Sequence, residues 1–452
     1  TVGQVEAARR IVEIDSVQVS LSPVDDDNLR NGVAEYCREH RIRLLAWRPL
    51  GGERASRLAK DPLLATLAAE HDATPAEIVL AWLASFENVV PIAGPTQVVH
   101  AASLGRAARL ELSAGALRSL DERFNGRLLR VPRAERRPTG AADGEVVVLM
   151  GMPGAGKSTV VREFVERGYA RLNRDTTGGT LSALVKALDA GISAGTRRWV
   201  LDNTYPTRRA RNEVIECAWE HGLEVRCVWL TTSIADAQVN AITRLLDVHG
   251  QLPSPEDLKR LGRSDPRYLG PDAQFRYERT LEAPAPDEGF GTIEARPFAR
   301  HKPADASARA LCLELDDVVW EGSPLGPAGV VLLPGRRDVL QRCAAEGLLL
   351  FAQGWRPQVA KGEATLDALH RGSERLRELA GVDIQVSWCV HEAGPPICWC
   401  RKPLPGLVLE FTVPRRVDIG TSLMVGRASA DRTLAERLGM PFEDGTAFFR
   451  VP

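Results

Sequence analysis

Short apolar runs alternate along this chain with longer stretches in which apolar residues recur every three or four positions. In the first segment the short runs lie at 16–20, 42–47 and 89–92, and the longer stretches lie at 27–39 and 75–84. The short runs predict strands and the longer stretches predict helices. Because the two kinds alternate at close spacing, we expect parallel α/β structure in this segment.

The same alternation continues through the rest of the chain, with apolar strands expected at 145–150, at 225–230 and from residue 310. A stretch with five arginines between the first and second segments predicts a solvated tether, and an accessory contact to a polyanion is the alternative. The expected organisation is a segment 1–126, an Arg-rich linker 127–143, a domain 144–298 and a domain 306–452.

Gly151-Met-Pro-Gly-Ala-Gly-Lys-Ser158 fits the phosphate-binding loop pattern G-x-x-x-x-G-K-[ST]. An apolar strand precedes the loop and a helical pattern at 159–165 follows it, which is the context that the motif requires. Glycines let backbone N–H groups converge on phosphate oxygens, and a helix N-terminus adds partial positive charge. The expected ligands are ATP and Mg²⁺. The expected nucleotide-binding residues are Gly151, Gly154, Gly156, Lys157, Ser158 and Thr159, with Lys157 bridging the β- and γ-phosphates and Ser158 ligating Mg²⁺.

Polar residues end the strands that follow the loop. We expect Asp175 to lie at the carboxyl edge of the sheet, where it would accept a proton from an attacking hydroxyl. Asp202 and Asn203 are expected at the same edge, where either could orient the substrate or hold a Mg²⁺-bound water, and Arg208 and Arg209 follow on a predicted helix. Arg244, on the predicted helix 231–244, would stabilise charge on the transferred phosphate. A lone aspartate after a strand is also a common cap or turn residue, but the ordered set favours a kinase.

Composition excludes several classes of protein. Apolar residues make up 44% of the 452 positions and charged residues 26%, which is typical of globular domains. A net charge of −1 provides no overall field toward nucleic acid or membrane, so a polyanion site must be a local patch. No run of 18 apolar residues predicts a membrane span, and no membrane partner is expected. The chain opens on Thr1 in mid-pattern, as a fragment would.

Eight cysteines occur, and the scattered ones suggest a reducing cytoplasm. Three cluster with a histidine: Cys389 and His391, then Cys398 and Cys400. Four soft ligands at this spacing predict a structural, tetrahedral Zn²⁺ site, and free thiols are the alternative.

The first segment resembles the C-terminal half of an aldo-keto reductase barrel, through Ala46-Trp-Arg-Pro-Leu-Gly-Gly52, Ala81-Trp-Leu83 and Pro91-Ile-Ala-Gly94. In that family the catalytic residues come from the first half of the barrel, and the second half supplies part of the NADP site. Ile92–Gln97 lacks the basic residue usual there. The resemblance therefore implies a partial (β/α)8-barrel fold without reductase activity of its own, unless upstream sequence completes it.

The middle segment resembles the kinase domain of polynucleotide kinase–phosphatases through the phosphate loop, Asn173-Arg-Asp175, Asp202-Asn-Thr204 and Glu288-Gly-Phe290. The resemblance implies a P-loop NTPase α/β/α sandwich that transfers the ATP γ-phosphate to 5′-hydroxyl ends of DNA or RNA. It gives Asp175 the role of general base and Arg244 that of lid arginine, and it leaves Arg208 or Arg209 as candidates for contact with the substrate phosphate. Repair ligases or other end-processing proteins are the partners implied.

The last segment resembles haloacid dehalogenase-type phosphatases with a zinc loop, through C-x-H…C-x-C-R-K-P, which implies a HAD-like Rossmannoid fold. Glu314 stands where that family has its nucleophilic aspartate, and Arg427 stands where it has a Mg²⁺-binding aspartate. The family's Ser/Thr is missing from the stretch 350–354. Lys402, Asp316 and Asp431 remain. These departures predict an inactive pseudophosphatase that acts as scaffold or nucleic-acid docking surface.

The fold class expected is thus multidomain α/β, and the leading hypothesis is a polynucleotide 5′-hydroxyl kinase with an inactive phosphatase domain. The alternatives are a small-molecule or zeta-toxin-like P-loop kinase, and a non-catalytic ATP-binding scaffold of degenerate modules. A reductase completed by upstream sequence is the fourth hypothesis.

Overall fold

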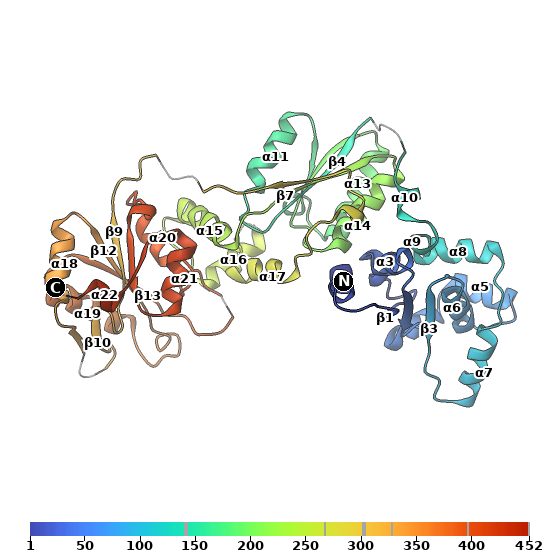
Figure 1. Ribbon diagram of the computed structural model, residues 1–452, viewed down its shortest axis with the longest axis horizontal. Helices are drawn as coiled ribbons and strands as arrows, with labels where there is room; N and C mark the ends of the chain where they lie inside the picture. The colour runs from blue at the N-terminus through green and yellow to red at the C-terminus, as the bar shows by residue number, and fades with distance from the viewer. Residues whose placement is uncertain (140–142, 266–267, 301–303, 327–328, 396, 451–452) are drawn as a thin grey trace. The chain divides into compact units, whose positions relative to one another are not determined.

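The computed structural model describes residues 1–139, 143–265, 268–300, 304–326, 329–395 and 397–450. The chain is a multidomain α/β protein built around parallel sheets (Figure 1). It forms two compact units. The first unit comprises Thr1–Met150, Val161–Trp229 and Leu281–Glu294, and the second comprises Gly151–Val160, Leu230–Thr280 and Ala295–Pro452. The predicted domain limits stay predictions, and residues 140–142 of the predicted linker lie outside the described residues.

The N-terminal part carries a three-stranded parallel sheet in the order β1-β2-β3, as the alternating pattern predicted. Apolar residues of the strands and of helices α3, α5, α6 and α8 form one core. The sheet is part of a barrel-like arrangement rather than a closed barrel within the described residues. Its elements are α1 (Val2–Arg9), β1 (Ser16–Ser20), α2 (Asp27–Arg30), α3 (Val33–Glu39), β2 (Arg43–Trp47), α4 (Ala55–Leu58), α5 (Pro62–Glu70), α6 (Pro75–Ala84), β3 (Val89–Ile92), α7 (Val98–Ala107) and α8 (Ala114–Phe124).

The single helix predicted over 27–39 is wrong, because two helices, α2 and α3, cover that stretch. Gly32 separates them with a φ of +83°, a backbone conformation that side chains other than glycine rarely adopt. A Cβ atom at Gly32 would lie 2.9 Å from Nε of Arg208, so the position also has no room for a side chain. The break therefore follows from backbone conformation and close packing, which an apolar pattern does not report.

The predicted solvated tether is also wrong. Residues 127–136 form two short helices, α9 (Arg127–Arg130) and α10 (Arg133–Arg136), and the side chains of Arg133 and Arg136 are buried. Both guanidinium groups pair with Glu35 and Glu216. Burial of Arg136 lowers its pKa, but the two carboxylates more than offset this, so the pKa lies above the ordinary value. These arginines are internal ion-pair partners.

A five-stranded sheet in the order β5-β6-β4-β7-β8 forms the middle of the chain. Strands β5, β6, β4 and β7 are parallel, and Val146, Val148 and Met150 of β4 share a core with α13 and α14. All the strands predicted here are confirmed. The elements are β4 (Glu145–Met150), α11 (Lys157–Glu166), β5 (Ala170–Leu172), α12 (Arg174–Thr177), α13 (Leu181–Ser193), β6 (Arg198–Asp202), α14 (Arg208–Glu220), β7 (Glu224–Leu230), α15 (Ile234–His249), α16 (Pro255–Ser264), α17 (Pro271–Thr280) and β8 (Thr292–Arg296).

The C-terminal part is an α/β/α sandwich around the parallel sheet β13-β12-β9-β14-β15 (Figure 1). Alternate residues of β9 face opposite sides: Leu311 and Leu313 pack with α18 and α19, whereas Ala310 and Cys312 pack with α20 and α21. The elements are β9 (Ala310–Glu314), β10 (Trp320–Gly322), β11 (Val330–Leu332), α18 (Arg336–Ala345), β12 (Leu349–Trp355), α19 (Leu366–Ala380), β13 (Ile384–Cys389), α20 (Gly406–Thr412), β14 (Leu423–Gly426), α21 (Ser429–Leu438), β15 (Phe442–Asp444) and α22 (Gly445–Phe448).

Helix α15 belongs to the same apolar core as α20 and α21. Its contribution consists of Val239, Ala241, Ile242, Leu245 and Leu246. The core therefore joins a helix of the predicted kinase segment to the phosphatase-like sandwich, within the second unit. No helix among the residues listed above is both long and apolar enough to cross a membrane.

Candidate active site

The phosphate loop follows β4 directly and leads into α11, as its motif requires. Three consecutive loop carbonyls are held by side chains from outside the loop. Gln274 donates to Pro153 O at 2.8 Å, Asn240 to Gly154 O at 2.9 Å and Thr232 to Ala155 O at 2.9 Å. These bonds fix the loop backbone, and the N–H of Ala155 also donates to the carbonyl of Met152 at 3.0 Å.

Glycine is required at position 154 of the loop. Its φ is +87°, and a Cβ atom there would lie 2.4 Å from the carbonyl oxygen of Ala237 in α15. Gly156 has a φ of +93°. The loop is thus pressed against α15, and any side chain at Gly154 would separate the two.

Lys157 opens α11, and its ammonium group donates to the carbonyls of Gly151 at 2.8 Å and Met152 at 3.0 Å. Ser158 and Thr159 follow in the first turn and are exposed. The lysine is therefore beside the loop, and the hydroxyl groups of the first turn are accessible to a cation and to phosphate oxygens.

Within the first unit, the ends of β5 and β6 are tied together by hydrogen bonds. Asn173 donates to the Asp202 carbonyl at 2.5 Å, and its own side-chain oxygen accepts from the Asp175 N–H at 2.6 Å. The Asn203 side chain accepts from the Arg174 N–H at 3.0 Å. These bonds hold α12 at the carboxyl end of the two strands. Asp175 lies on that short helix with its side chain exposed.

The remaining polar residues predicted near the substrate have protein partners. The Asp202 carboxylate is buried and pairs with Arg171. Arg208 is buried and pairs with Asp287 at 2.8 Å, and Arg209 pairs with Asp27. A substrate phosphate would have to compete with these carboxylates, so the predicted substrate role of the two arginines stays a prediction.

Glu288 forms an internal ion pair. It is 1% exposed, and its two oxygens each lie 2.7 Å from a nitrogen of Arg211, which is 0% exposed. Arg211 also donates to the carbonyl of Tyr205 at 3.1 Å. The geometry is bidentate and fully buried, so Glu288 holds α14 in place.

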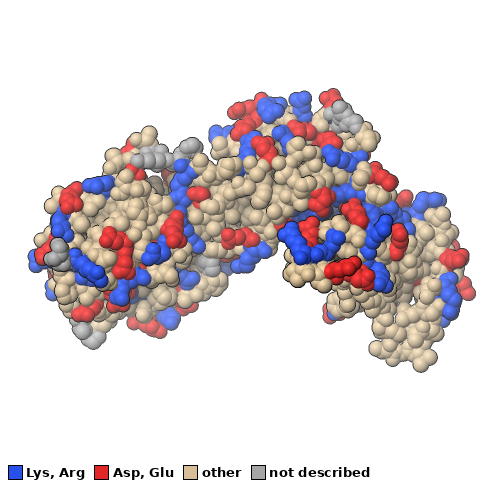
Figure 2. Space-filling view, viewed as in Figure 1, with Lys and Arg blue, Asp and Glu red and all other residues tan. Residues whose placement is uncertain are grey.

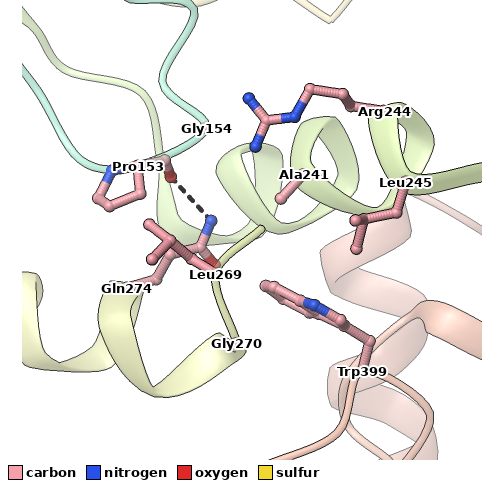
Figure 3. A pocket seen from close by; sticks show the side chains of 9 residues that line it. All are labelled: Pro153, Gly154, Ala241, Arg244, Leu245, Leu269, Gly270, Gln274 and Trp399. Carbon is pink, nitrogen blue, oxygen red and sulfur yellow. Dashed lines mark hydrogen bonds between the residues drawn. The ribbon is translucent and has the colours of Figure 1, made fainter. Parts of the chain in front are cut away.

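Arg244 lines a pocket next to the phosphate loop (Figure 3). Pro153 and Gly154 of the loop form one wall, and α15 supplies Ala241, Arg244 and Leu245. Trp399 enters from the segment between β13 and α20. The sequence indicated Arg244, whereas it gave no signal for Trp399 or Thr232, because their relation to the loop exists only in the folded chain.

In the phosphatase-like site, Arg427 stands where the family pattern has a metal-binding aspartate, and Lys402 lies between two carboxylates. Lys402 pairs with Glu314 and with Asp431, the latter at 2.5 Å. Asp431 is 0% exposed, and its other oxygen accepts from the N–H groups of Arg427 and Ala428, both at 3.0 Å. Burial lowers the pKa of Lys402 below its ordinary value, although the nearby Asp431 carboxylate acts in the opposite direction. The two carboxylates therefore share one protein cation.

Asp316 is held by Arg356, whose two terminal nitrogens lie 2.6 and 2.7 Å from the carboxylate oxygens. Trp320 donates to the same carboxylate at 3.0 Å. Burial raises the pKa of Asp316, but these hydrogen bonds outweigh it, so the pKa lies below its ordinary value. The Asp316 carboxylate is consequently favoured in its charged form.

The four predicted metal ligands come together. The ligand atoms of Cys389, His391, Cys398 and Cys400 all lie within 4.8 Å of one another. The two sulfurs of Cys389 and Cys398 are 3.9 Å apart, and Nδ1 of His391 lies 3.1 Å from the Cys400 sulfur. Zn–S bonds of about 2.3 Å give a tetrahedron an edge of about 3.8 Å. The donor set and its spacing fit Zn²⁺, which would supply cross-linking rather than catalysis.

Positive and negative side chains are interspersed on the face shown in Figure 2. This distribution agrees with the net charge of −1. Contact with a polynucleotide would therefore depend on a few local groups.

Different known proteins are similar to different parts of the chain. The aldo/keto reductase family model matches residues 1–123. A Schizosaccharomyces pombe bifunctional polynucleotide phosphatase/kinase is 32% identical over 158 residues, which is 34% of this chain and 34% of that protein. The chain thus spans about a third of the length of this relative.

Among solved structures, a thermostable aldo-keto reductase is 32% identical with a TM-score of 0.25, the match covering 26% of this chain and 43% of that one. A heptose bisphosphate phosphatase of B. bronchiseptica is 24% identical with a TM-score of 0.27, covering 30% and 78%.

A Thermoplasma acidophilum protein named "Probable D-glycero-D-manno-heptose-1,7-bisphosphate 7-phosphatase" is 30% identical over 137 residues, which is 29% of this chain and 77% of that protein. Over the stretch that this match covers, the chain belongs to the heptose-bisphosphate phosphatase family.

Proposed function

We propose that the chain is an ATP- and Mg²⁺-dependent polynucleotide 5′-hydroxyl kinase. The observation that carries the proposal is the phosphate loop, whose carbonyls at positions 153, 154 and 155 are held by Gln274, Asn240 and Thr232. Such a loop is preorganised for phosphate before any nucleotide binds. The similarity to a polynucleotide phosphatase/kinase supports the choice of substrate.

Each residue has a distinct role in the proposed reaction. Asp175 accepts the proton of the 5′-hydroxyl. The hydroxyl oxygen forms a bond to the γ-phosphorus of ATP, the bond between that phosphorus and the β–γ bridging oxygen breaks, and ADP is released. Lys157 leaves the loop carbonyls and contacts the β- and γ-phosphates. Ser158 would hold Mg²⁺, which would offset negative charge on the phosphates, and Arg244 stabilises charge on the transferred group. A repair ligase would consume the resulting 5′-phosphate end.

The test is transfer of labelled γ-phosphate from ATP to a panel of DNA and RNA oligonucleotides with 5′-hydroxyl ends. We expect transfer that falls by about 100-fold or more in Lys157→Ala and in Asp175→Asn. Asp189→Asn, an exposed aspartate on α13, is the matched control and should retain full activity. Full activity in Asp175→Asn would refute its role as the base. Transfer only to small molecules would replace the proposal with a small-molecule kinase.

We propose in addition that the phosphatase-like part is catalytically inactive, because Arg427 stands where the resembled family has a Mg²⁺-binding aspartate and Glu314 stands where it has the nucleophile. Glu314 is also one methylene longer than the aspartate it replaces, which displaces any in-line attack. The same oligonucleotides carrying 3′-phosphates test this point. Release of phosphate by the chain would overturn it.

A further inference from the structure

The zinc loop, residues 389–400, meets the phosphate loop within the second unit. Trp399 stands between the two ligands Cys398 and Cys400, and it is 2% exposed. Its indole lines the pocket whose opposite wall is Pro153 and Gly154 of the phosphate loop (Figure 3). The metal ligands therefore fix a side chain that reaches the nucleotide-binding element.

The backbone of Trp399 is anchored on its far side as well. Its carbonyl accepts a hydrogen bond from the N–H of Gly406 at 3.0 Å, at the start of α20. A Cβ atom at Gly406 would lie 2.4 Å from that carbonyl, so the approach is as close as glycine allows. Trp399 thus has little freedom while the four ligands are gathered.

Trp399 packs against the elements that hold the loop carbonyls. Ala241 and Leu245 of α15 line the pocket beside it, and α15 also carries Asn240, which holds the carbonyl of Gly154. Gln274 lines the same pocket, is 1% exposed and holds the carbonyl of Pro153. Removing the indole would leave a cavity beneath both supports, which would then shift to fill it.

We infer that Trp399 is a positioning residue for nucleotide binding and that it couples the zinc site to the phosphate loop. The inference rests on the proposed kinase function and extends it. Zinc gathers its four ligands, Cys398 and Cys400 seat Trp399 between them, and Trp399 keeps α15 and Gln274 in place to hold the phosphate loop ready for nucleotide. Nucleotide and zinc should therefore strengthen each other's binding by the same factor.

Calorimetric titration of the zinc-loaded full chain with ADP and Mg²⁺ tests the positioning role. We expect Trp399→Ala to weaken ADP binding about tenfold. Trp399→Phe should bind within about threefold of the wild type, because the indole N–H has no hydrogen-bond partner and only its shape is needed. Gln274→Glu keeps the shape but loses the donor to Pro153, so it should also weaken ADP binding.

Phe411→Leu is the matched control. Phe411 belongs to the same apolar core but does not line the pocket. The variant should lower the thermal unfolding midpoint and leave the affinity for ADP unchanged. Equal loss of ADP affinity in Phe411→Leu and Trp399→Ala would mean general loosening of the core and would overturn the inference.

Zinc affinity of the wild-type chain, measured by competition with a chelator, tests the coupling without any substitution. We expect saturating ADP to raise it by about tenfold, matching the effect of zinc on ADP binding. A wild type that binds ADP with no change in zinc affinity would overturn the coupling and leave the kinase proposal intact. A wild type that binds no ADP would defeat both proposals.

Discussion

At the scale of single residues, the ion pair of Arg211 and Glu288 carries a prediction about stability. Both side chains are fully buried, so removal of one partner leaves an uncompensated charge. We expect Glu288→Ala to destabilise the fold by about 3–5 kcal/mol. Glu378→Ala, which breaks an exposed pair with Arg375, should cost under about 1 kcal/mol. Thermal unfolding of the two variants provides the comparison, and equal midpoints would contradict the prediction.

The carboxylate of Asp316 gives a prediction about the stability of the fold at low pH. Its pKa in the folded chain is below the ordinary value, because the hydrogen bonds from Arg356 and Trp320 outweigh burial. The stabilisation from this carboxylate is therefore present above the unfolded pKa of about 3.9 and is lost as the pH falls through the lower folded pKa. Asp316→Asn should remove that part of the acid sensitivity. The unfolding midpoints of the wild type and of Asp316→Asn should converge as the pH falls from about 5 to about 2. Midpoints that change in parallel with pH in the two proteins would contradict this prediction.

A third prediction concerns Glu314: replacing it with aspartate should not restore phosphatase activity. Glu314→Asp restores the shorter carboxylate of the family, yet Arg427 still stands where a metal-binding aspartate is expected and Lys402 still pairs with Asp431. We expect no release of 3′-phosphate from this variant. Measurable release from Glu314→Asp alone would show that the length of the side chain was the sole defect, and that the cationic residues are harmless.

At the scale of elements, the burial of arginines in α10 leads us to expect that this helix resists cleavage by trypsin. A solvated tether would be cut by trypsin after any of its arginines, but Arg133 and Arg136 are buried in a helix and paired with Glu35 and Glu216. We expect limited trypsin digestion to spare these two positions and to cut after Arg127, whose side chain is exposed. Glu35→Ala should open the buried sites. Early cutting after Arg136 in the wild type would contradict the structure.

The elements also show what a sequence can predict. The strand, loop and helix around Lys157 were predictable because the motif, its glycines and its flanking apolar runs are neighbours in the chain. Likewise the four ligands of the zinc loop are close in sequence, and the structure gathers them. The break in the helix at Gly32 was not predictable from the sequence, because it depends on the side chain of Arg208, which comes close to Gly32 only after folding. Burial of Arg133 was hidden for the same reason, because composition alone describes an arginine-rich stretch as solvated.

At the scale of the whole molecule, the fold class was predictable while the relations among its parts were not. Alternating apolar patterns indicated parallel α/β structure in every segment, and three parallel sheets are present in the residues described. Trp399 carries no motif, and its place beside Gly154 follows from long-range packing. Residues of this kind are found only in the folded chain, because neither their type nor their spacing sets them apart.

The core that α15 shares with α20 and α21 has a consequence for how this chain can change over generations. A module that has lost its chemistry is normally free to be deleted. Here deletion would strip the cover from Ile242, Leu245 and Leu246 and expose an apolar face on the helix that supports the phosphate loop. If the phosphatase-like part is inactive, as proposed, selection for the kinase activity alone would still retain both modules, because the phosphatase-like part covers apolar side chains of its neighbour.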